Sequence, residues 1–247
     1  MKTRTPPAGI QKAFDFTPPR PRPFLSNLSA RIDTYEEGVA RYFQWRTGLD
    51  YYATIDQVVE FVIGTRRMKV LDLLSDTGTF ALRLAGRKAF PGKVYSFDSN
   101  ITLLERARQR ALHLKLQTSV EFRHCPEPRL PVADSFGEIA VSIFDFHRHP
   151  PERFLSDAWR VLCPDGHLLI AEMLEPKTAG NRCLWMLKQL HLKYVQKDAA
   201  EAHGSYYDRD QLIQLVFAAG FRQVIIQELS NRRSRHHGVF CLVAATK

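Results

Sequence analysis

The sequence predicts an α/β domain of the doubly wound class, with a mostly parallel sheet of about seven strands and a helical extension before the first strand. From about Met68 onward, short apolar segments alternate with longer amphipathic ones, and glycine, proline or aspartate residues separate them. Strands separated by helices of this length pair in parallel, with right-handed crossovers and helices on both faces of the sheet. This is a Rossmann-like arrangement.

The expected elements follow in chain order. Two helices lie within 31–67, because apolar residues recur there at helical spacing on either side of Gly48 and Asp50. We expect strands at 69–74, 93–98, 120–124, 139–144, 167–173, 221–227 and 239–245, the last two as an antiparallel pair. Helices are expected at 80–86, 102–114, 151–162 and 211–219, with a helical insertion at about 181–195.

Length and composition favour one domain with an added arm. The protein has 247 residues, 45% of them hydrophobic, which suits one substantial core. Residues 31–247 are expected to form the α/β domain. Residues 1–30 are rich in proline and basic residues and are interpreted as a flexible arm. A loosely packed tail, a nucleic-acid contact and a protein partner remain open for this arm.

The net charge and the spacing of the cysteines limit the kinds of partner, metal site and disulfide that we expect. A formal net charge of +9 favours anionic partners without identifying one. The cysteines at 125, 163, 183 and 241 have neither the spacing of a zinc site nor that of a disulfide framework, so no metal site is expected. No stretch approaches the roughly 18 apolar residues of a membrane span. We therefore expect a soluble, cytoplasmic protein.

The carboxyl ends of the first four strands define the expected ligand edge. Ligands of such sheets bind where the strand order reverses, which brings together 73–79, Asp98, 124–129 and 144–149. A carboxylate at the position of Asp98 often accepts hydrogen bonds from a ribose hydroxyl pair. Two structural roles remain open: Asp98 as a cap for the following helix, and Ser75, Asp76 and Thr77 as a cap for the helix from Phe80.

Several ordered blocks carry a family resemblance. They lie at 70–73 (VLDL), 77–80 (TGTF), 94–99 (VYSFDS), 130–131 (LP), 134–136 (DSF), 154–170 and 218–221 (AAGF). Together they resemble class I S-adenosylmethionine-dependent methyltransferases over about residues 35–247, and are most similar to the group of ubiquinone and menaquinone C-methyltransferases. The resemblance implies a cofactor-binding half at 68–174 and a lid helix with closing strands at 175–247. Its implied cofactor contacts are Asp72, Leu74, Ser75, Gly78, Asp98, Ser99, Glu127 and Phe144.

The sequence also departs from the family's pattern. The loop after the first strand usually reads D-x-G-x-G-x-G, and here Leu74 and Asp76 occupy the first two glycine positions, with Gly78 retained. Glycine permits positive φ and close approach of a ligand. Leu74 adds bulk, and Asp76 adds a charge that either repels the carboxylate of the cofactor or faces its positive end. Pro126 stands where the family often has an acidic residue, one position before Glu127.

Two functions follow as expectations. The first is an S-adenosylmethionine-dependent methyltransferase acting on a small molecule, with no catalytic residue assigned and with His147, His149 or His203 available as a base. The second is a catalytically silent protein of the same fold that serves as a binding or assembly subunit.

The aromatic residues between Tyr42 and Tyr52 are expected to pack in the core more than to form a lid over the pocket. The basic turn at 232–237 is expected to be a solvated hairpin tip, with an RNA or phosphate contact as its alternative.

Overall fold

The computed structural model describes residues 34–126, 129–176, 183, 185–187, 190, 204–229 and 239–247. Its seven-stranded sheet has the order β3-β2-β1-β4-β5-β7-β6. The strands are β1 (Lys69–Asp72), β2 (Lys93–Asp98), β3 (Val120–His124), β4 (Gly137–Ile143), β5 (Leu162–Leu174), β6 (Arg222–Glu228) and β7 (Val239–Thr246). The predicted α/β fold is confirmed.

The first five strands form the parallel part of the sheet: β1 pairs with β2 on one side and with β4 on the other, β2 pairs with β3, and β4 pairs with β5. The strand order therefore reverses at β1. The expected antiparallel closing pair is also present, with β7 lying between β5 and β6 and antiparallel to both. The reversal at β1 creates the crevice that doubly wound sheets use for ligands.

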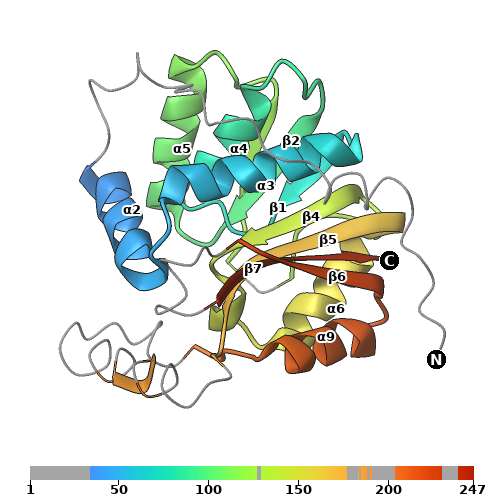
Figure 1. Cartoon of the computed structure of the whole chain (residues 1–247). Coiled ribbons are helices and arrows are strands. Elements are labelled where there is room, and N and C mark those ends of the chain that lie inside the picture. Colours follow the sequence, from blue (N-terminus) through green and yellow to red (C-terminus); the bar gives the residue numbers. More distant parts are fainter. Residues whose placement is uncertain are drawn as a thin grey trace.

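Helices cover both faces of the sheet (Figure 1). They are α2 (Thr34–Thr47), α3 (Tyr51–Thr65), α4 (Thr79–Ala85), α5 (Ile101–His113), α6 (Pro151–Val161) and α9 (Arg209–Ala218), with a short 3₁₀ turn, η2 (Phe146–Arg148). One apolar cluster joins the sheet to α2, α3, α4 and α5. A second cluster on the other face joins it to α6 and α9.

The helix caps differ from the sequence-based expectations. The alternative in which Asp98 caps α5 is not the one observed, because the side chain of Asn100 accepts the N–H groups of Thr102 and Leu103. The alternative in which Ser75, Asp76 or Thr77 caps α4 is also wrong. That helix starts after Gly78, which has φ 76°, and no side chain caps it.

Two strands end earlier than predicted, and both ends shape the crevice. The chain leaves β1 after Asp72: the N–H of Leu73 still donates to Val141, and the N–H of Ser75 then donates to Phe97 on β2. The loop thus crosses from one neighbour of β1 to the other. Strand β4 ends at Ile143 because Phe144 takes φ 53°, a left-handed conformation outside the strand region.

Several predicted features lie outside the described residues: the arm at 1–30, most of the insertion at 181–195, Glu127, His203 and the basic turn at 232–237. In the described ranges, no helix is long and apolar enough to span a membrane. No cluster of metal-ligating side chains occurs in the same ranges.

Candidate functional site

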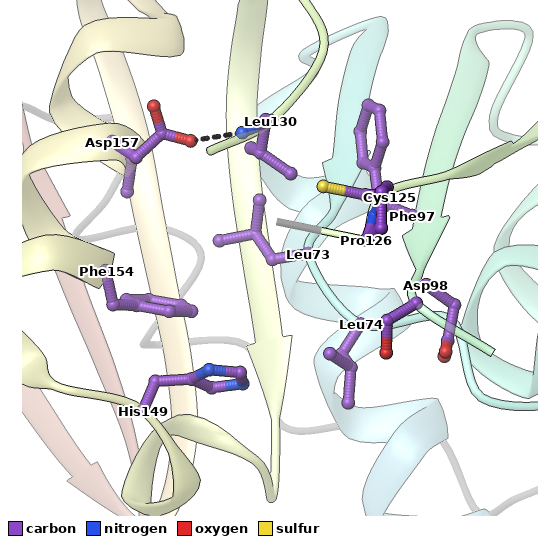
Figure 2. Close-up of a pocket in the computed structure, with 12 residues that line it drawn as sticks. Leu73, Leu74, Phe97, Asp98, Cys125, Pro126, Leu130, His149, Phe154 and Asp157 are labelled. Carbon is purple, nitrogen blue, oxygen red and sulfur yellow. Dashed lines mark hydrogen bonds between the residues drawn. The ribbon is translucent and has the colours of Figure 1, made fainter. Parts of the chain in front are cut away.

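A pocket of about 260 Å³ opens at the carboxyl ends of β1, β2 and β3. Figure 2 shows Asp98, Cys125 and Pro126 on one side of it, Phe154 and Asp157 of α6 on the other, and Leu73 and Leu74 between them. Its remaining lining comes from Phe97, Ser99, Leu130, His149 and Ala158. The walls are mainly apolar and include two carboxylates, Asp98 at the end of β2 and Asp157 on α6. Such a lining suits a flat apolar group that carries hydroxyls.

Asp98 combines a structural and a potential binding role. One carboxylate oxygen accepts the N–H of Asp76, and the other accepts that of Asn100, each at 2.7 Å. These bonds hold the loop after β1 and the start of α5 together. The backbone at Ser99 also hydrogen-bonds to this carboxylate. A carboxylate has about four acceptor positions, so these backbone bonds do not use its full capacity.

The loop after β1 keeps the backbone of a glycine loop in spite of its side chains. Asp76 has φ 47° and Gly78 has φ 76°, both in the left-handed region that glycine adopts without strain. A Cβ at Gly78 would lie 2.9 Å from two ring atoms of Phe122 and 3.1 Å from the Cβ of Ala107. The retained glycine is therefore required for packing as well as for its φ angle.

Helix α2 braces this loop from the N-terminal side. The hydroxyl of Tyr35 donates to Asp76 Oδ1 at 3.1 Å, and that of Thr79 donates to Glu36 at 2.9 Å. Arg110 of α5 pairs with Glu36 at 2.9 Å and donates to the carbonyl of Thr77 at 2.8 Å. The helical extension is thus part of the site's framework.

Three carboxyl groups gather around the loop, and burial raises the pKa of each. Burial is the main cause of the rise in the pKa of Asp72 to about 8, and Asp98 and Asp76 add to it, while the Ser96 hydroxyl opposes it. Burial also raises the pKa of Asp76 to about 6, against the effect of the Tyr35 hydroxyl. The pKa of Asp98 is raised by burial as well. Burial therefore favours the protonated form of Asp72 more strongly than that of Asp76.

On the other side of the pocket, Arg160 fixes the segment from Leu130 to Asp134. Its guanidinium donates to the carbonyls of Leu130 and Val132 and to the carboxylates of Asp134 and Asp157, at 2.7 to 3.0 Å. Asp157 in turn accepts the N–H of Leu130 at 2.6 Å (Figure 2). Two blocks that are separate in the sequence therefore build one wall.

A second cluster follows β4. His147 is buried, and its Nδ1 donates to Glu172 Oε2 at 2.9 Å. Glu172 also accepts the backbone N–H groups of His147 and Met173, so it acts as a carboxylate acceptor on all three bonds. This pairing favours the tautomer in which Nε2 of His147 carries the lone pair, as a general base requires. Its ring stacks on Tyr206, with centroids 4.7 Å apart.

The other predicted histidine, His149, lines the first pocket. Its Nε2 lies 2.6 Å from Asp145 Oδ2, and its ring is 5.8 Å from that of Phe154. The carboxylate of Asp145 therefore orients this imidazole. Of the three candidate bases, the structure thus places His149 in the pocket and His147 in the buried cluster beside it.

The predicted cofactor contacts are only partly brought together. Leu74, Asp98 and Ser99 line the pocket. Asp72 and Ser75 are buried beneath it, and Gly78 opens α4. Phe144 instead packs against Phe43, Phe240 and His147, at 5.2, 6.0 and 5.4 Å between ring centroids. Phe43 is fully buried, as expected for core, whereas Trp45 is 37% exposed.

Sequence reasoning missed the residues whose roles depend on distant partners. They are Tyr35, Glu36, Arg110, Asp157 and Glu172. The only available signal was for Glu172, an acidic residue inside an otherwise apolar strand pattern, since a buried charge needs a partner.

Comparisons with known proteins agree with this geometry. A family model described as a methyltransferase domain matches residues 70–166. The ubiquinone/menaquinone biosynthesis C-methyltransferase UbiE of Cronobacter sakazakii is 28% identical over 174 residues, covering 65% of this chain and 69% of that protein. The protein of the same name from Francisella philomiragia is 25% identical over 180 residues, covering 66% and 70%.

Solved structures share the fold. A Thermotoga maritima protein described as an SAM-dependent methyltransferase, possible histamine N-methyltransferase, has a TM-score of 0.61 at 19% identity, covering 87% of this chain and 97% of that chain. An SAM-dependent methyltransferase from Aquifex aeolicus has a TM-score of 0.58 at 19% identity, covering 87% and 99%.

Proposed function

We propose that this chain, a class I S-adenosylmethionine-dependent methyltransferase by its domain family and its fold, transfers the cofactor's methyl group to a small-molecule acceptor. The observation that carries the proposal is the pocket at the carboxyl ends of β1 to β3, with Asp98 at its rim. The curated relatives are named as C-methyltransferases of ubiquinone and menaquinone biosynthesis, which supports a small-molecule acceptor.

The pocket residues fit the adenosine part of the cofactor. Leu74, Pro126 and Leu130 provide apolar surface for a purine, and Asp98 at the rim is a carboxylate acceptor for a ribose hydroxyl. Its volume of about 260 Å³ is slightly below the roughly 300 Å³ at which typical ligand pockets begin, so it suits a part of the cofactor and not the whole. The methionine part would extend along the loop towards Asp76.

The loop's departures from the family pattern leave this role intact. Asp76 has the positive φ that the family obtains from glycine, and its side chain accepts the Tyr35 hydroxyl. Leu74 narrows the pocket but adds to its apolar wall. These substitutions raised the alternative of a catalytically silent protein. Neither the similar proteins nor the geometry of the loop supports it.

When bound, S-adenosylmethionine supplies an electrophilic methyl group on a sulfonium. The protein's contribution is to position the acceptor in line with that group and to exclude water, because positioning supplies much of the acceleration in such transfers. If the acceptor must lose a proton, the buried pair of His147 and Glu172 can take it, since the carboxylate stabilises the imidazolium that forms. His149, held by Asp145, is the alternative base nearer the pocket.

The proposal is tested by incubating the protein with methyl-labelled S-adenosylmethionine and a mixed extract. We expect label in the low-molecular-weight fraction. The Asp98→Asn variant should transfer roughly tenfold less at subsaturating cofactor, since a charged hydrogen bond contributes about 1.5–3 kcal/mol. Label confined to protein or nucleic acid would overturn the small-molecule acceptor. Absence of label in every fraction would overturn the activity itself.

A further inference from the structure

Arg46, near the end of α2, is buried, and its charge has no partner in the part of the chain that the structure describes. The residue has 0% exposed surface, and among the described residues none of its Nε, Nη1 and Nη2 atoms has a hydrogen-bond acceptor. Buried charges are normally paired, and buried polar groups are normally hydrogen-bonded, because leaving them unmatched is costly. The side chain is therefore complete only when an acceptor for its N–H groups arrives.

Two aromatic rings form a corner around this guanidinium. Its central carbon lies 4.5 Å from the ring centroid of Trp185 and 5.4 Å from that of Tyr206. The two rings are nearly perpendicular, at 89°, with centroids 4.8 Å apart. Ring faces attract a cation, but they leave the N–H donors along its edge unsatisfied. That edge is where arginine binds planar, two-oxygen anions.

The corner adjoins the cluster after β4. Tyr206 stacks on His147 at 14° between ring planes, and His147 is paired with Glu172. At the other end of α2, Tyr35 contacts Asp76 in the loop of the proposed cofactor site. Tyr35 and Arg46 are 11 residues apart in one helix, or roughly 16 Å. Helix α2 thus links the loop after β1 to the aromatic corner around Arg46. This corner lies beside His147 and away from the loop.

We propose that Arg46 binds a carboxylate group of the methyl acceptor. This inference rests on the proposed methyl transfer and identifies the acceptor class as a carboxylic acid. One guanidinium matches the single charge and the two oxygens of a carboxylate.

Benzoate and its neutral analogue benzamide test the proposal, because they differ mainly in charge. In calorimetric titrations of the wild-type protein, with and without S-adenosylmethionine, we expect benzoate to bind with a Kd on the order of 1 mM and benzamide at least about tenfold more weakly. Arg46→Met should abolish this preference. Arg46→Lys keeps the charge but loses the planar guanidinium that donates two parallel hydrogen bonds to a carboxylate. It should bind benzoate about tenfold more weakly.

Thermal unfolding of the same variants separates binding from a structural role. Arg46→Met should unfold at an unchanged or higher temperature, because removing an unpaired buried charge relieves its desolvation cost. Arg41→Met, an exposed arginine of the same helix, is the matched control and should keep the preference for benzoate.

Three results would overturn the assignment. The first is equal binding of benzoate and benzamide by the wild type. The second is an undiminished preference in Arg46→Met. The third is a tenfold loss of S-adenosylmethionine affinity in Arg46→Met with benzoate binding unchanged, which would assign the guanidinium to the cofactor's own carboxylate. Failure of the wild type to bind S-adenosylmethionine would instead count against the proposed function, and the titrations without cofactor would still test Arg46.

Discussion

Replacing Gly78 by alanine should destabilise the protein even when no cofactor is bound. A non-glycine residue at its φ of 76° costs about 1–2 kcal/mol. The added Cβ would lie 2.9 Å from the ring of Phe122, which is 7% exposed and cannot withdraw into solvent, and overpacking of this kind costs about 1–3 kcal/mol. Alanine also restricts the unfolded chain, which returns about 0.4–1 kcal/mol. We therefore expect a net loss of about 1–5 kcal/mol.

Urea unfolding followed by far-ultraviolet circular dichroism measures this loss. Gly38→Ala is the matched control, because no atom lies within 4 Å of the Cβ that it would add to helix α2. That control should stabilise the protein by about 0.5–1 kcal/mol through helix propensity. Equal effects of the two substitutions, or a loss below about 1 kcal/mol for Gly78→Ala, would refute the packing explanation for the retained glycine.

Three further predictions concern the walls of the pocket. Since the pKa of Asp76 is raised from 3.8 to about 6 in the folded state, its ionisation destabilises the fold as pH rises from about 4 through 6. In urea titrations, the unfolding free energy of Asp76→Asn relative to wild type should thus rise by up to about 3 kcal/mol between pH 4 and 7, and a pH-independent difference would contradict this. Arg160→Lys should cost about 1–3 kcal/mol, because lysine cannot reach all four of the acceptors of Arg160, while the exposed Arg41→Lys should change stability by less than about 0.5 kcal/mol; similar values for both would count against the brace. Replacing Leu74 and Asp76 together by glycine should weaken S-adenosylmethionine binding in calorimetry, because it removes part of the apolar wall and the Tyr35 contact, and tighter binding would show that these side chains obstruct the site.

The sequence predicted the fold well because the relevant signals are local. Apolar segments of strand length, separated by helical segments, predicted the sheet, and the end of β2 placed Asp98 correctly at the rim of the pocket. Strand ends were less predictable. Phe144 continues an apolar pattern, yet its positive φ takes it out of β4 and into an aromatic cluster.

Site residues could be predicted from the sequence only where their role depends on one local segment. The partners of Asp76 and Thr79 lie in a helix about forty residues earlier, and the partner of His147 lies on the next strand. No local pattern links such residues. Arg46 shows the same limit, because its unpaired charge becomes visible only when burial and contacts are known together.

Calorimetric titration of the wild-type protein with S-adenosylmethionine, up to millimolar concentration, tests the central claim most directly. The crevice described here should give saturable heat with one site per chain, and the demethylated product should compete for it. The same titration of Asp98→Asn should show roughly tenfold or greater loss of affinity, because the ribose hydroxyls lose a charged acceptor. Absence of heat and of any thermal shift with both ligands would contradict the claim that this chain is a cofactor-binding methyltransferase.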